Sequence, residues 1–260
     1  MIQKTLVLLA VAAISGISYA ENNILQQSGL TVTGAATLAS DYRWRGQSQG
    51  ENDPAIQGTF TIAHTTGLYF NAFASSVDLP LSNGKSANLE LDPTIGFTKQ
   101  LDFGAFKPNL DVGLAYYNYV SAGELNYLEV FLRLGFANAM IEGDLLTPSI
   151  AYTNDYGGNA ISDTVGGKVD NWNFNLLYSV PFADTGFGGV ASVGYTKANQ
   201  VIYGNDDHFI DWKAGVTYNV KSVAGLTAEL DVVGTNIEGF TGAADRAVKT
   251  GALFSLTKTF

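Results

Sequence analysis

Apolar and polar side chains alternate along most of this chain with a period of two, which is the spacing of side chains on a β-strand. In the first long segment, Leu30–Arg45, one face is mostly aliphatic or aromatic and the other carries threonine, aspartate and arginine. Further segments of this kind are Pro54–His64, Leu68–Val77, Ala87–Lys99, Phe106–Asn118, Asn126–Phe136, Ala139–Thr153, Asn171–Pro181, Gly188–Lys197, Asp207–Asn219, Gly225–Gly234 and Lys249–Phe260. The pattern therefore predicts an all-β protein of about 12 strands.

The connections between these segments alternate in length. Those after the odd-numbered segments are generally long and polar: Gly46–Asp53, Asp78–Ser86, Tyr119–Leu125, Asn154–Asp170, Ala198–Asp206 and Thr235–Val248. Those after the even-numbered segments are mostly shorter, as at Thr65–Gly67, Asn138 and Phe182–Phe187. A soluble β-sandwich has no reason to keep this order, whereas membrane barrels combine long external loops with short periplasmic turns. We therefore expect a transmembrane antiparallel up-and-down β-barrel over residues 30–260.

The last segment also suits a barrel. Thr250–Phe260 is apolar on one face and hydroxylic on the other, and it ends on an aromatic residue, which resembles the closing strand of bacterial outer-membrane barrels. Lys258 lies on the apolar face, where a lysine at the edge of a bilayer can extend its ammonium group to water. The same segment would suit an edge strand of a soluble sandwich, so the whole-chain pattern decides. We expect this strand to pair with the first and to be recognised by the barrel assembly machinery.

The first 20 residues have the order of a secretory signal peptide. Lys4 gives a charged start, an apolar stretch runs from Leu6 to Ile14, and Ser18-Tyr19-Ala20 provides a small-x-small cleavage site. The apolar stretch is shorter than the roughly 20 residues that a membrane-spanning helix needs. We therefore expect residues 1–20 to be cleaved, residues 21–29 to form a short periplasmic segment, and the remaining barrel to lie in the outer membrane of a Gram-negative bacterium.

Composition removes several classes of function. The chain has no cysteine and two histidines, so it offers no disulfide framework, no thiolate metal site and little for a zinc cluster. Its 24 acidic residues exceed its 14 basic ones, and the acidity argues against nucleic acid as a partner. We expect no cofactor, no metal and no catalytic residue. The expected partners are outer-membrane lipid, lipopolysaccharide and small solutes.

Aromatic residues on the outward faces cluster near the two ends of the predicted strands. This is the distribution of a protein held at two membrane interfaces, with aliphatic residues between the two belts. The expected interface aromatics are Tyr42, Trp44, Tyr116, Trp172 and Tyr195 at the external side and Tyr218 and Phe260 at the periplasmic side.

Two short stretches resemble a known family. Ser40-Asp41-Tyr42-Arg43-Trp44-Arg45-Gly46-Gln47-Ser48-Gln49 is similar to the amino-terminal signature of the TorF family of porins, and Ser255-Leu256-Thr257-Lys258-Thr259-Phe260 resembles that family's carboxy terminus. The two stretches bracket nearly all of the chain after the signal peptide, and the middle offers no sharp motif. The resemblance implies an outer-membrane barrel with a role in the diffusion of small solutes.

The inward faces are expected to line a water-filled passage. They carry mainly acidic side chains, with a small basic group near the external end of the first strand. Rings of acidic side chains favour cations, so we expect a porin with a mild cation preference. The expected pore-lining residues are Asp41, Arg43, Arg45, Glu90, Asp92, Asp111, Glu129, Arg133, Glu142, Asp144, Asp211, Lys213, Glu229 and Asp231.

Three alternatives to an open pore remain. The inward arginines and lysine could pair with the carboxylates and plug the interior, because a barrel of twelve strands is intermediate between filled and open barrels. The long loops Asn154–Asp170 and Thr235–Val248 could bind a surface partner. An outer-membrane hydrolase is the weakest alternative, because neither His64 nor His208 has the identifiable partners of a catalytic dyad or triad.

Overall fold

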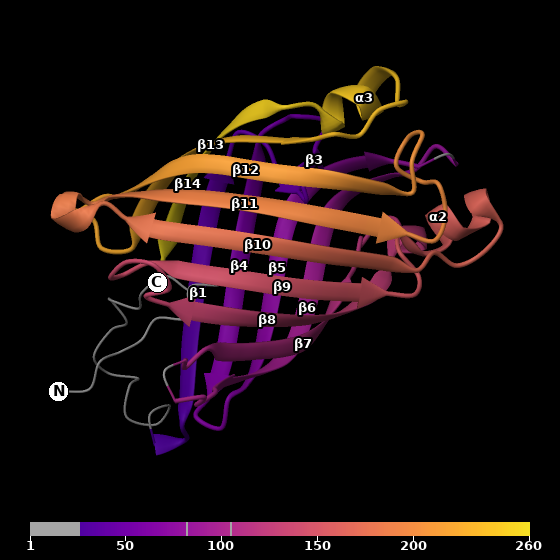
Figure 1. Cartoon of the computed structure of the whole chain (residues 1–260). Coiled ribbons are helices and arrows are strands. Elements are labelled where there is room, and N and C mark those ends of the chain that lie inside the picture. The colour runs from indigo at the N-terminus through magenta and orange to yellow at the C-terminus, as the bar shows by residue number, and fades with distance from the viewer. Residues whose placement is uncertain (1–26, 82, 105) are drawn as a thin grey trace.

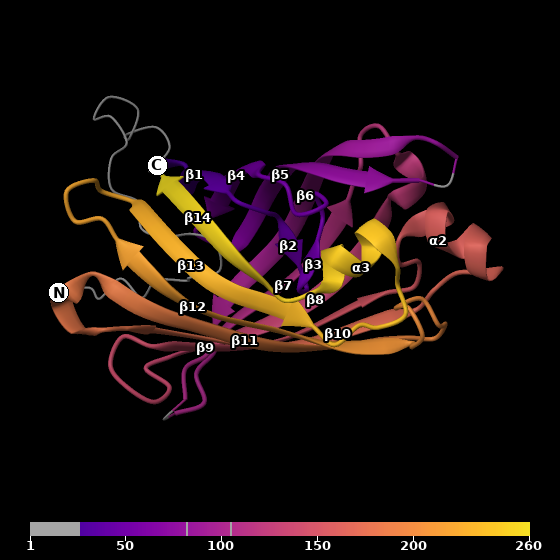
Figure 2. The ribbon, with the colours of Figure 1, turned by 90° about the horizontal axis from the view of Figure 1, so that it is seen from above.

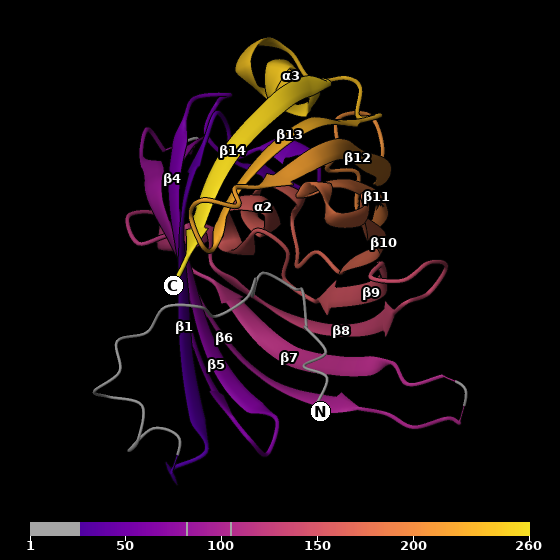
Figure 3. The same cartoon turned by 90° about the vertical axis from the view of Figure 1, so that its left-hand side faces the viewer.

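The computed structural model describes residues 27–81, 83–104 and 106–260. Twelve antiparallel strands form a closed barrel in which the last strand, β14, pairs with the first, β1 (Figures 1 and 3). The barrel strands are β1 Leu30–Ala39, β4 Ala55–His64, β5 Leu68–Pro80, β6 Ser86–Gln100, β7 Asn109–Tyr117, β8 Tyr127–Ala137, β9 Leu145–Thr153, β10 Asn171–Pro181, β11 Phe187–Ala198, β12 His208–Asn219, β13 Leu226–Thr235 and β14 Gly251–Thr259. The predicted fold class is confirmed. The expected signal peptide, residues 1–20, lies outside the described residues.

The two ends of the barrel differ. The end that carries the longer connections, here called the loop end, holds the hairpin of β2 (Arg43–Trp44) and β3 (Gln47–Ser48), the short helix η1 (Gly123–Leu125) and the helices α2 (Gly158–Val165) and α3 (Gly242–Val248). The opposite end, the turn end, holds η2 (Ala183–Thr185) and the last residue of the chain. Figure 2 shows β3 beside α3, with which it is in contact. In the described part of the chain, no helix is long and apolar enough to cross a membrane.

The outer wall of the barrel is apolar. Large side chains such as Ile56, Ile95 and Leu230 point outward and are 69%, 58% and 58% exposed, whereas their sequence neighbours on the other face point into the barrel. A wall of this kind would be a large unfavourable apolar surface in water, and a bilayer removes that cost. Because each strand pairs with a neighbour on both sides, the closed sheet satisfies most of the backbone hydrogen bonds of the wall internally, as a bilayer requires.

The barrel closes through the carboxy-terminal residue. The backbone N–H of Gly34 donates to the carbonyl of Phe260 at 2.9 Å, and the N–H of Phe260 donates to the carbonyl of Gly34 at 3.0 Å. A Cβ atom on Gly34 would lie 2.6 Å from Cε2 of the Phe260 ring. The aromatic ring therefore covers the strand where the glycine leaves room for it.

The two strand boundaries that differ most from the sequence prediction are the end of β1 and the start of β9. β1 ends at Ala39 and not at Arg45, because Ser40 exchanges hydrogen bonds with Phe254 and the chain then turns into the barrel. β9 begins at Leu145 and not at Ala139, because residues 138–144 form a turn that is organised around Asp144. In both cases the polar–apolar alternation continues past the end of the strand.

Candidate functional site in the barrel interior

The barrel encloses a cavity of about 950 Å³. It extends from His64 and Gly67 at the turn end to Tyr42 and Trp44 near the loop end. The volume falls at the upper end of the range for small-molecule sites. The cavity is therefore large enough to hold a small hydrophilic solute or several ions.

One arc of the cavity wall is uncharged. The lining residues of β14, β1 and β4 include no aspartate, glutamate, lysine or arginine and are mostly hydroxyl or amide side chains. These polar residues are Thr31, Thr33, Thr37, Gln57, Thr59, Thr61, Ser255 and Thr257. Hydroxyl groups can donate and accept hydrogen bonds, so this arc can solvate a neutral polar solute.

The charged lining residues of the barrel strands stand on either side of that arc, and Asp41 and Arg43 lie in the connection between β1 and β4. Arg133 on β8 pairs with Asp111 on β7 at 3.4 Å, and Lys213 on β12 pairs with Glu229 on β13 at 2.8 Å. The charged lining residues are Asp41, Arg43, Asp92, Asp111, Glu129, Arg133, Lys213, Glu229 and Asp231, which makes six acidic and three basic. The wall of the cavity therefore has a net negative charge.

The β2–β3 hairpin crosses the interior at the loop end of the cavity. Its tip is Arg45–Gly46, and both residues have positive φ, 49° and 76°. A Cβ atom at position 46 would lie 2.7 Å from the carbonyl oxygen of Gly234, so glycine is required for the tip to approach β13. The hairpin tip thus lies inside the lumen against β13, which is two strands away from β1 in the barrel.

An ion pair fixes the hairpin to the barrel wall. Nη2 of Arg45 donates to Oε2 of Glu129 on β8 at 2.7 Å, and the two side chains are only 8% and 4% exposed. Tyr117 donates to the other oxygen of Glu129 at 3.2 Å, and the Arg45 guanidinium lies 4.9 Å from the centre of the Trp44 ring. The guanidinium is therefore enclosed by a carboxylate and aromatic rings.

Arg43 fixes the other side of the same hairpin. Its Nη1 donates to the carbonyls of Ala247 and Lys249 at 2.9 and 3.1 Å, in the connection between β13 and β14. Its other nitrogens donate to the side chains of Asp41 and Asn52. The two arginines thus tie residues 43–48 to different parts of the barrel.

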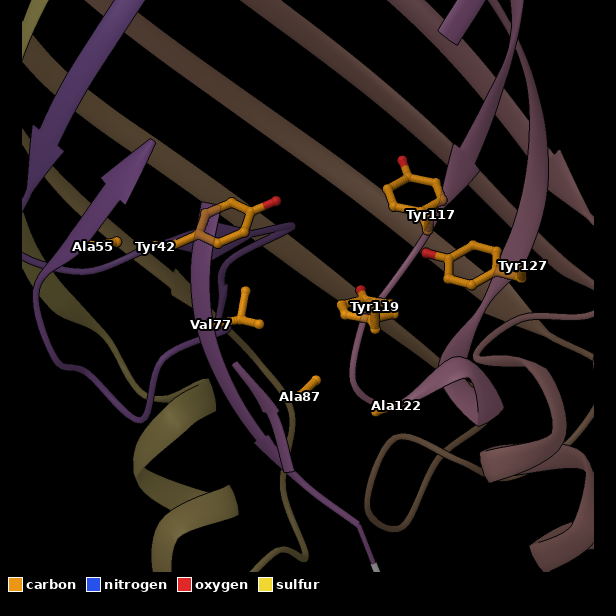
Figure 4. Close-up of a cluster of buried hydrophobic side chains, with 8 residues drawn as sticks. All are labelled: Tyr42, Ala55, Val77, Ala87, Tyr117, Tyr119, Ala122 and Tyr127. Atoms are coloured by element: carbon orange, nitrogen blue, oxygen red, sulfur yellow. The ribbon is translucent and has the colours of Figure 1, made fainter. Parts of the chain in front are cut away.

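Buried apolar side chains fill the loop end around the hairpin. One cluster consists of Tyr42, Ala55, Val77, Ala87, Tyr117, Tyr119, Ala122 and Tyr127 (Figure 4). A second consists of Val169, Ala198, Tyr203, Phe209, Ile237 and Val248. Tyr156 packs against both clusters, with its ring 5.3 Å from Tyr127 and 6.1 Å from Tyr203. Together with the hairpin, these clusters occupy the interior of the barrel at the loop end.

The structure corrects two of the expected interface aromatics. Tyr42 is 9% exposed and belongs to the first buried cluster, and Trp44 packs against that cluster and lines the cavity. Both predictions were wrong because the chain leaves the barrel wall at Ser40, so that the alternation beyond it no longer distinguishes lipid from lumen. The remaining expected interface aromatics lie on barrel strands or at the closing residue: Tyr116, Trp172, Tyr195, Tyr218 and Phe260.

The expected pore-lining residues fall into three groups. Nine of them line the cavity and are the charged residues named above. Arg45, Glu90 and Asp211 point inward but are enclosed by other side chains; the Asp211 carboxylate lies against Gly194 of β11, where a Cβ atom would approach it to 2.2 Å. Glu142 and Asp144 lie in the turn 138–144, so their placement on a pore-lining strand was wrong.

Asp144 has a structural role in that turn. Its carboxylate accepts from the backbone N–H groups of Ala139, Met140 and Ile141 at 2.6, 2.9 and 2.9 Å and from the Tyr178 hydroxyl at 2.8 Å. Burial by itself raises the pKa of Asp144, but these hydrogen bonds outweigh it and hold the pKa below its usual range. The carboxylate therefore accepts hydrogen bonds from backbone N–H groups of the turn that have no partner on a neighbouring strand.

The two histidines make local contacts. Nδ1 of His64 lies 2.8 Å from the Thr66 hydroxyl at the turn end. His208 lies 2.9 Å from Asp207, and Asp207 also pairs with Lys197. Hydrogen bonds from Lys197 and His208 lower the pKa of Asp207. Among the described residues, no group of three histidine, cysteine or acidic side chains could hold a metal ion.

Sequence reasoning missed the inward-facing tyrosines. Rings follow one another from Trp44 through Tyr117, Tyr127 and Tyr156 to Tyr203, with neighbouring centroids 4.6 to 6.1 Å apart. Their only signal in the sequence is the density of tyrosine near the long connections. Their grouping depends on the closure of the barrel, which brings distant connections together.

Comparison with known proteins identifies the family. Residues 24–260 match a family that is described as "Bacterial protein of unknown function (Gcw_chp)". The chain belongs to this family. No curated protein sequence matches it significantly.

Solved structures that resemble this chain include outer-membrane channels. The NanC porin has a TM-score of 0.53 at 9% identity, over 88% of this chain and 98% of the porin. An outer membrane channel of Pseudomonas putida F1 has a TM-score of 0.47 at 13% identity, over 88% of this chain and 95% of the channel. Pseudomonas aeruginosa OccK5 (OpdH) has a TM-score of 0.46 at 13% identity, over 89% of this chain and 67% of that protein. The likeness to the NanC porin shows a shared fold, and this barrel with its apolar outer wall lies in the bacterial outer membrane.

Proposed function

We propose that this protein is an outer-membrane channel for the passive diffusion of small hydrophilic solutes and ions. The observation that carries the proposal is a polar cavity of about 950 Å³ inside a closed barrel whose outer wall is apolar. A barrel that served only as a membrane anchor would gain nothing from a cavity of this size, since interiors otherwise pack densely. The resemblance of Ser40–Gln49 and Ser255–Phe260 to the TorF family of porins supports the same function, and the proposal includes no enzymatic activity.

The channel is proposed to prefer cations mildly. Six acidic and three basic side chains line the cavity, so a permeating cation meets a net attractive field and an anion a repulsive one. The preference is mild because most of the carboxylates already have basic partners, as Asp111 has in Arg133 and Glu229 in Lys213.

Passage through the loop end requires movement of the hairpin. Residues 43–48 and the two apolar clusters occupy that end, so we infer that the conformation described here is a closed state of the channel. The hairpin lies outside the barrel sheet; its two strands pair at Arg43–Ser48 and Trp44–Gln47, and the Gln49 N–H donates to the Tyr42 carbonyl at 2.8 Å. It can therefore leave the lumen without breaking a barrel strand.

Conductance in planar bilayers tests this function. The refolded protein is inserted between chambers that hold KCl at two concentrations, and a variant that lacks residues 43–48 is measured in parallel. We expect single-channel events in both proteins, with a higher open fraction in the deletion variant and a reversal potential of the sign that cation selectivity gives. Clear anion selectivity would overturn the proposed preference.

The closed loop end favours one second candidate, a non-conducting barrel whose loops bind a surface partner. The buried clusters that join α2 and α3 to the barrel give these connections a defined shape. If neither the intact protein nor the hairpin deletion conducts, although both insert and fold, the channel function fails and this candidate replaces it.

A further inference from the structure

The enclosed guanidinium of Arg45 occupies a position that resembles a ligand site. Glu129, Tyr117 and Trp44 surround it and also line the cavity, so a solute in the cavity can reach the same groups. The occupant belongs to the hairpin that closes the loop end. The site and the closure therefore involve the same side chain.

We propose that Glu129, Tyr117 and Trp44 form the recognition site of the channel for small organic cations that carry a guanidinium group, and that Arg45 occupies this site in the closed state. The inference rests on the proposed channel function. A guanidinium solute that displaces Arg45 removes the attachment of the hairpin to β8, and the hairpin can then leave the lumen. Such solutes both open the channel and pass through it.

The shape and charge of the site explain this choice of ligand. A guanidinium is planar and more weakly hydrated than an ammonium ion, so it can face an aromatic ring and donate to a carboxylate at the same time. Arg45 does both, with Trp44 at 4.9 Å from its guanidinium carbon and Glu129 at 2.7 Å from its Nη2. Its Nη1 is buried and has no hydrogen-bond partner in the protein. The guanidinium of a free solute is not attached to the hairpin, so it can rotate until more of its N–H groups find acceptors.

The attachment of Arg45 can be reversed because the hairpin has a second anchor. Arg43 holds the hairpin to the connection before β14 through the carbonyls of Ala247 and Lys249. When the Arg45 contact is broken, this anchor keeps the hairpin at the rim of the barrel. Because the Arg43 contacts hold the hairpin nearby, Arg45 can leave the site and later return to it.

Binding is tested first, without conduction. Calorimetric titrations in detergent use methylguanidinium, methylammonium and neutral urea, with the intact protein and the Arg45→Ala variant. We expect Arg45→Ala to bind methylguanidinium at least tenfold more tightly than methylammonium and more tightly than the intact protein does, because the site is vacant. The double variant Arg45→Ala/Glu129→Gln should bind methylguanidinium at least tenfold more weakly than Arg45→Ala does. Arg45→Gln replaces Arg45→Ala if the latter does not refold, and Arg246→Ala, an exposed arginine on α3, is the matched control.

Conduction is tested second, in planar bilayers with KCl. We expect methylguanidinium to raise the open fraction of the intact channel in a saturable way, and to cause brief interruptions in Arg45→Ala, which is already open. Equal binding of the two cations by Arg45→Ala, or an intact channel that conducts but does not respond to methylguanidinium, overturns the inference and leaves the channel function standing. Selective binding by Arg45→Ala without conduction in any variant overturns the channel function and shows that the site binds a guanidinium ligand only.

Discussion

Nη2 of Arg45 lies 2.7 Å from Oε2 of Glu129, and more than nine-tenths of each side chain is buried. The pair joins the inward hairpin to β8 over 84 positions of sequence. Removal of one member of a buried pair leaves the other charge without compensation, which is the costly case for buried ions.

The Arg45→Ala variant should therefore be destabilised by about 3 kcal/mol, the lower end of the range for a broken buried pair, because Glu129 retains contact with the cavity. The exposed pair of Lys85 and Glu124 provides the control, and Lys85→Ala should change stability by less than about 1 kcal/mol. Urea unfolding of the refolded barrels in lipid vesicles measures both values. Equal effects of the two substitutions would contradict the role assigned to burial.

The selectivity of the channel should respond to the hairpin arginines. Replacing both Arg43 and Arg45 with alanine removes two positive charges from the loop end of the lumen, so the reversal potential in a KCl gradient should shift further towards that of a cation-selective channel. The single variant Arg246→Ala, on the exposed side of α3, should leave the potential unchanged. Unchanged selectivity together with lost stability in the double variant would instead indicate that the arginines serve only to plug the interior.

The turn at Asp144 should make stability depend on pH in the acid range. Because the folded state holds the pKa of Asp144 below that of the unfolded chain, its stabilising effect is complete above the unfolded pKa of about 3.9 and is lost as pH falls through the lower folded pKa. The difference in unfolding free energy between the intact protein and Asp144→Asn should thus be largest at neutral pH and shrink below about pH 4. Glu142→Gln, in the same turn but exposed, is the matched control and should show no such pH-dependent difference.

Two glycines at the turn end separate backbone strain from steric overlap. Gly67 and Gly104 both have positive φ, 99° and 76°. A Cβ atom at Gly67 would lie 2.1 Å from the carbonyl oxygen of Thr98, whereas a Cβ atom at Gly104 would have no neighbouring atom within 4 Å. Gly104→Ala should cost about 1 kcal/mol from the backbone conformation alone. Gly67→Ala should cost at least about twice as much, because the backbone of the neighbouring strand must also move. Urea unfolding of the two variants under one set of conditions makes the comparison, and equal losses would show that the overlap is relieved without cost.

The sequence predicts the barrel well because a barrel wall has one side in lipid and the other in water. Each strand then repeats the same two-residue alternation, and twelve weak signals combine into one strong pattern. The same reasoning fails at Tyr42 and Trp44, since the inward hairpin is itself a short β-ribbon and keeps the alternation. The period of two identifies an extended segment but does not say which surfaces lie on its two sides.

The acidic residues show a second limit. Asp111 and Asp144 occupy similar places in the alternating pattern, yet one lines the cavity and the other binds backbone N–H groups of a turn. The difference depends on where the strand ends, and strand ends are set by turn geometry that the alternation does not encode. The tyrosines that meet at the loop end depend further on the circular order of the strands, which places Tyr127 and Tyr203 on either side of Tyr156.

The pairing of β1 with β14 has a consequence for folding. Ala39 pairs with Ser255 and Ala35 with Thr259, so these contacts join residues that are more than 200 positions apart. Contacts of such long range form slowly, because a large loop must close before they contribute. Until β14 arrives, one edge of β1 presents unpaired backbone groups that can pair with another chain. The pairing of β14 with β1 therefore both completes the wall and covers this edge of β1 against aggregation. It can form only when the last segment of the chain, which ends at Phe260, has reached β1.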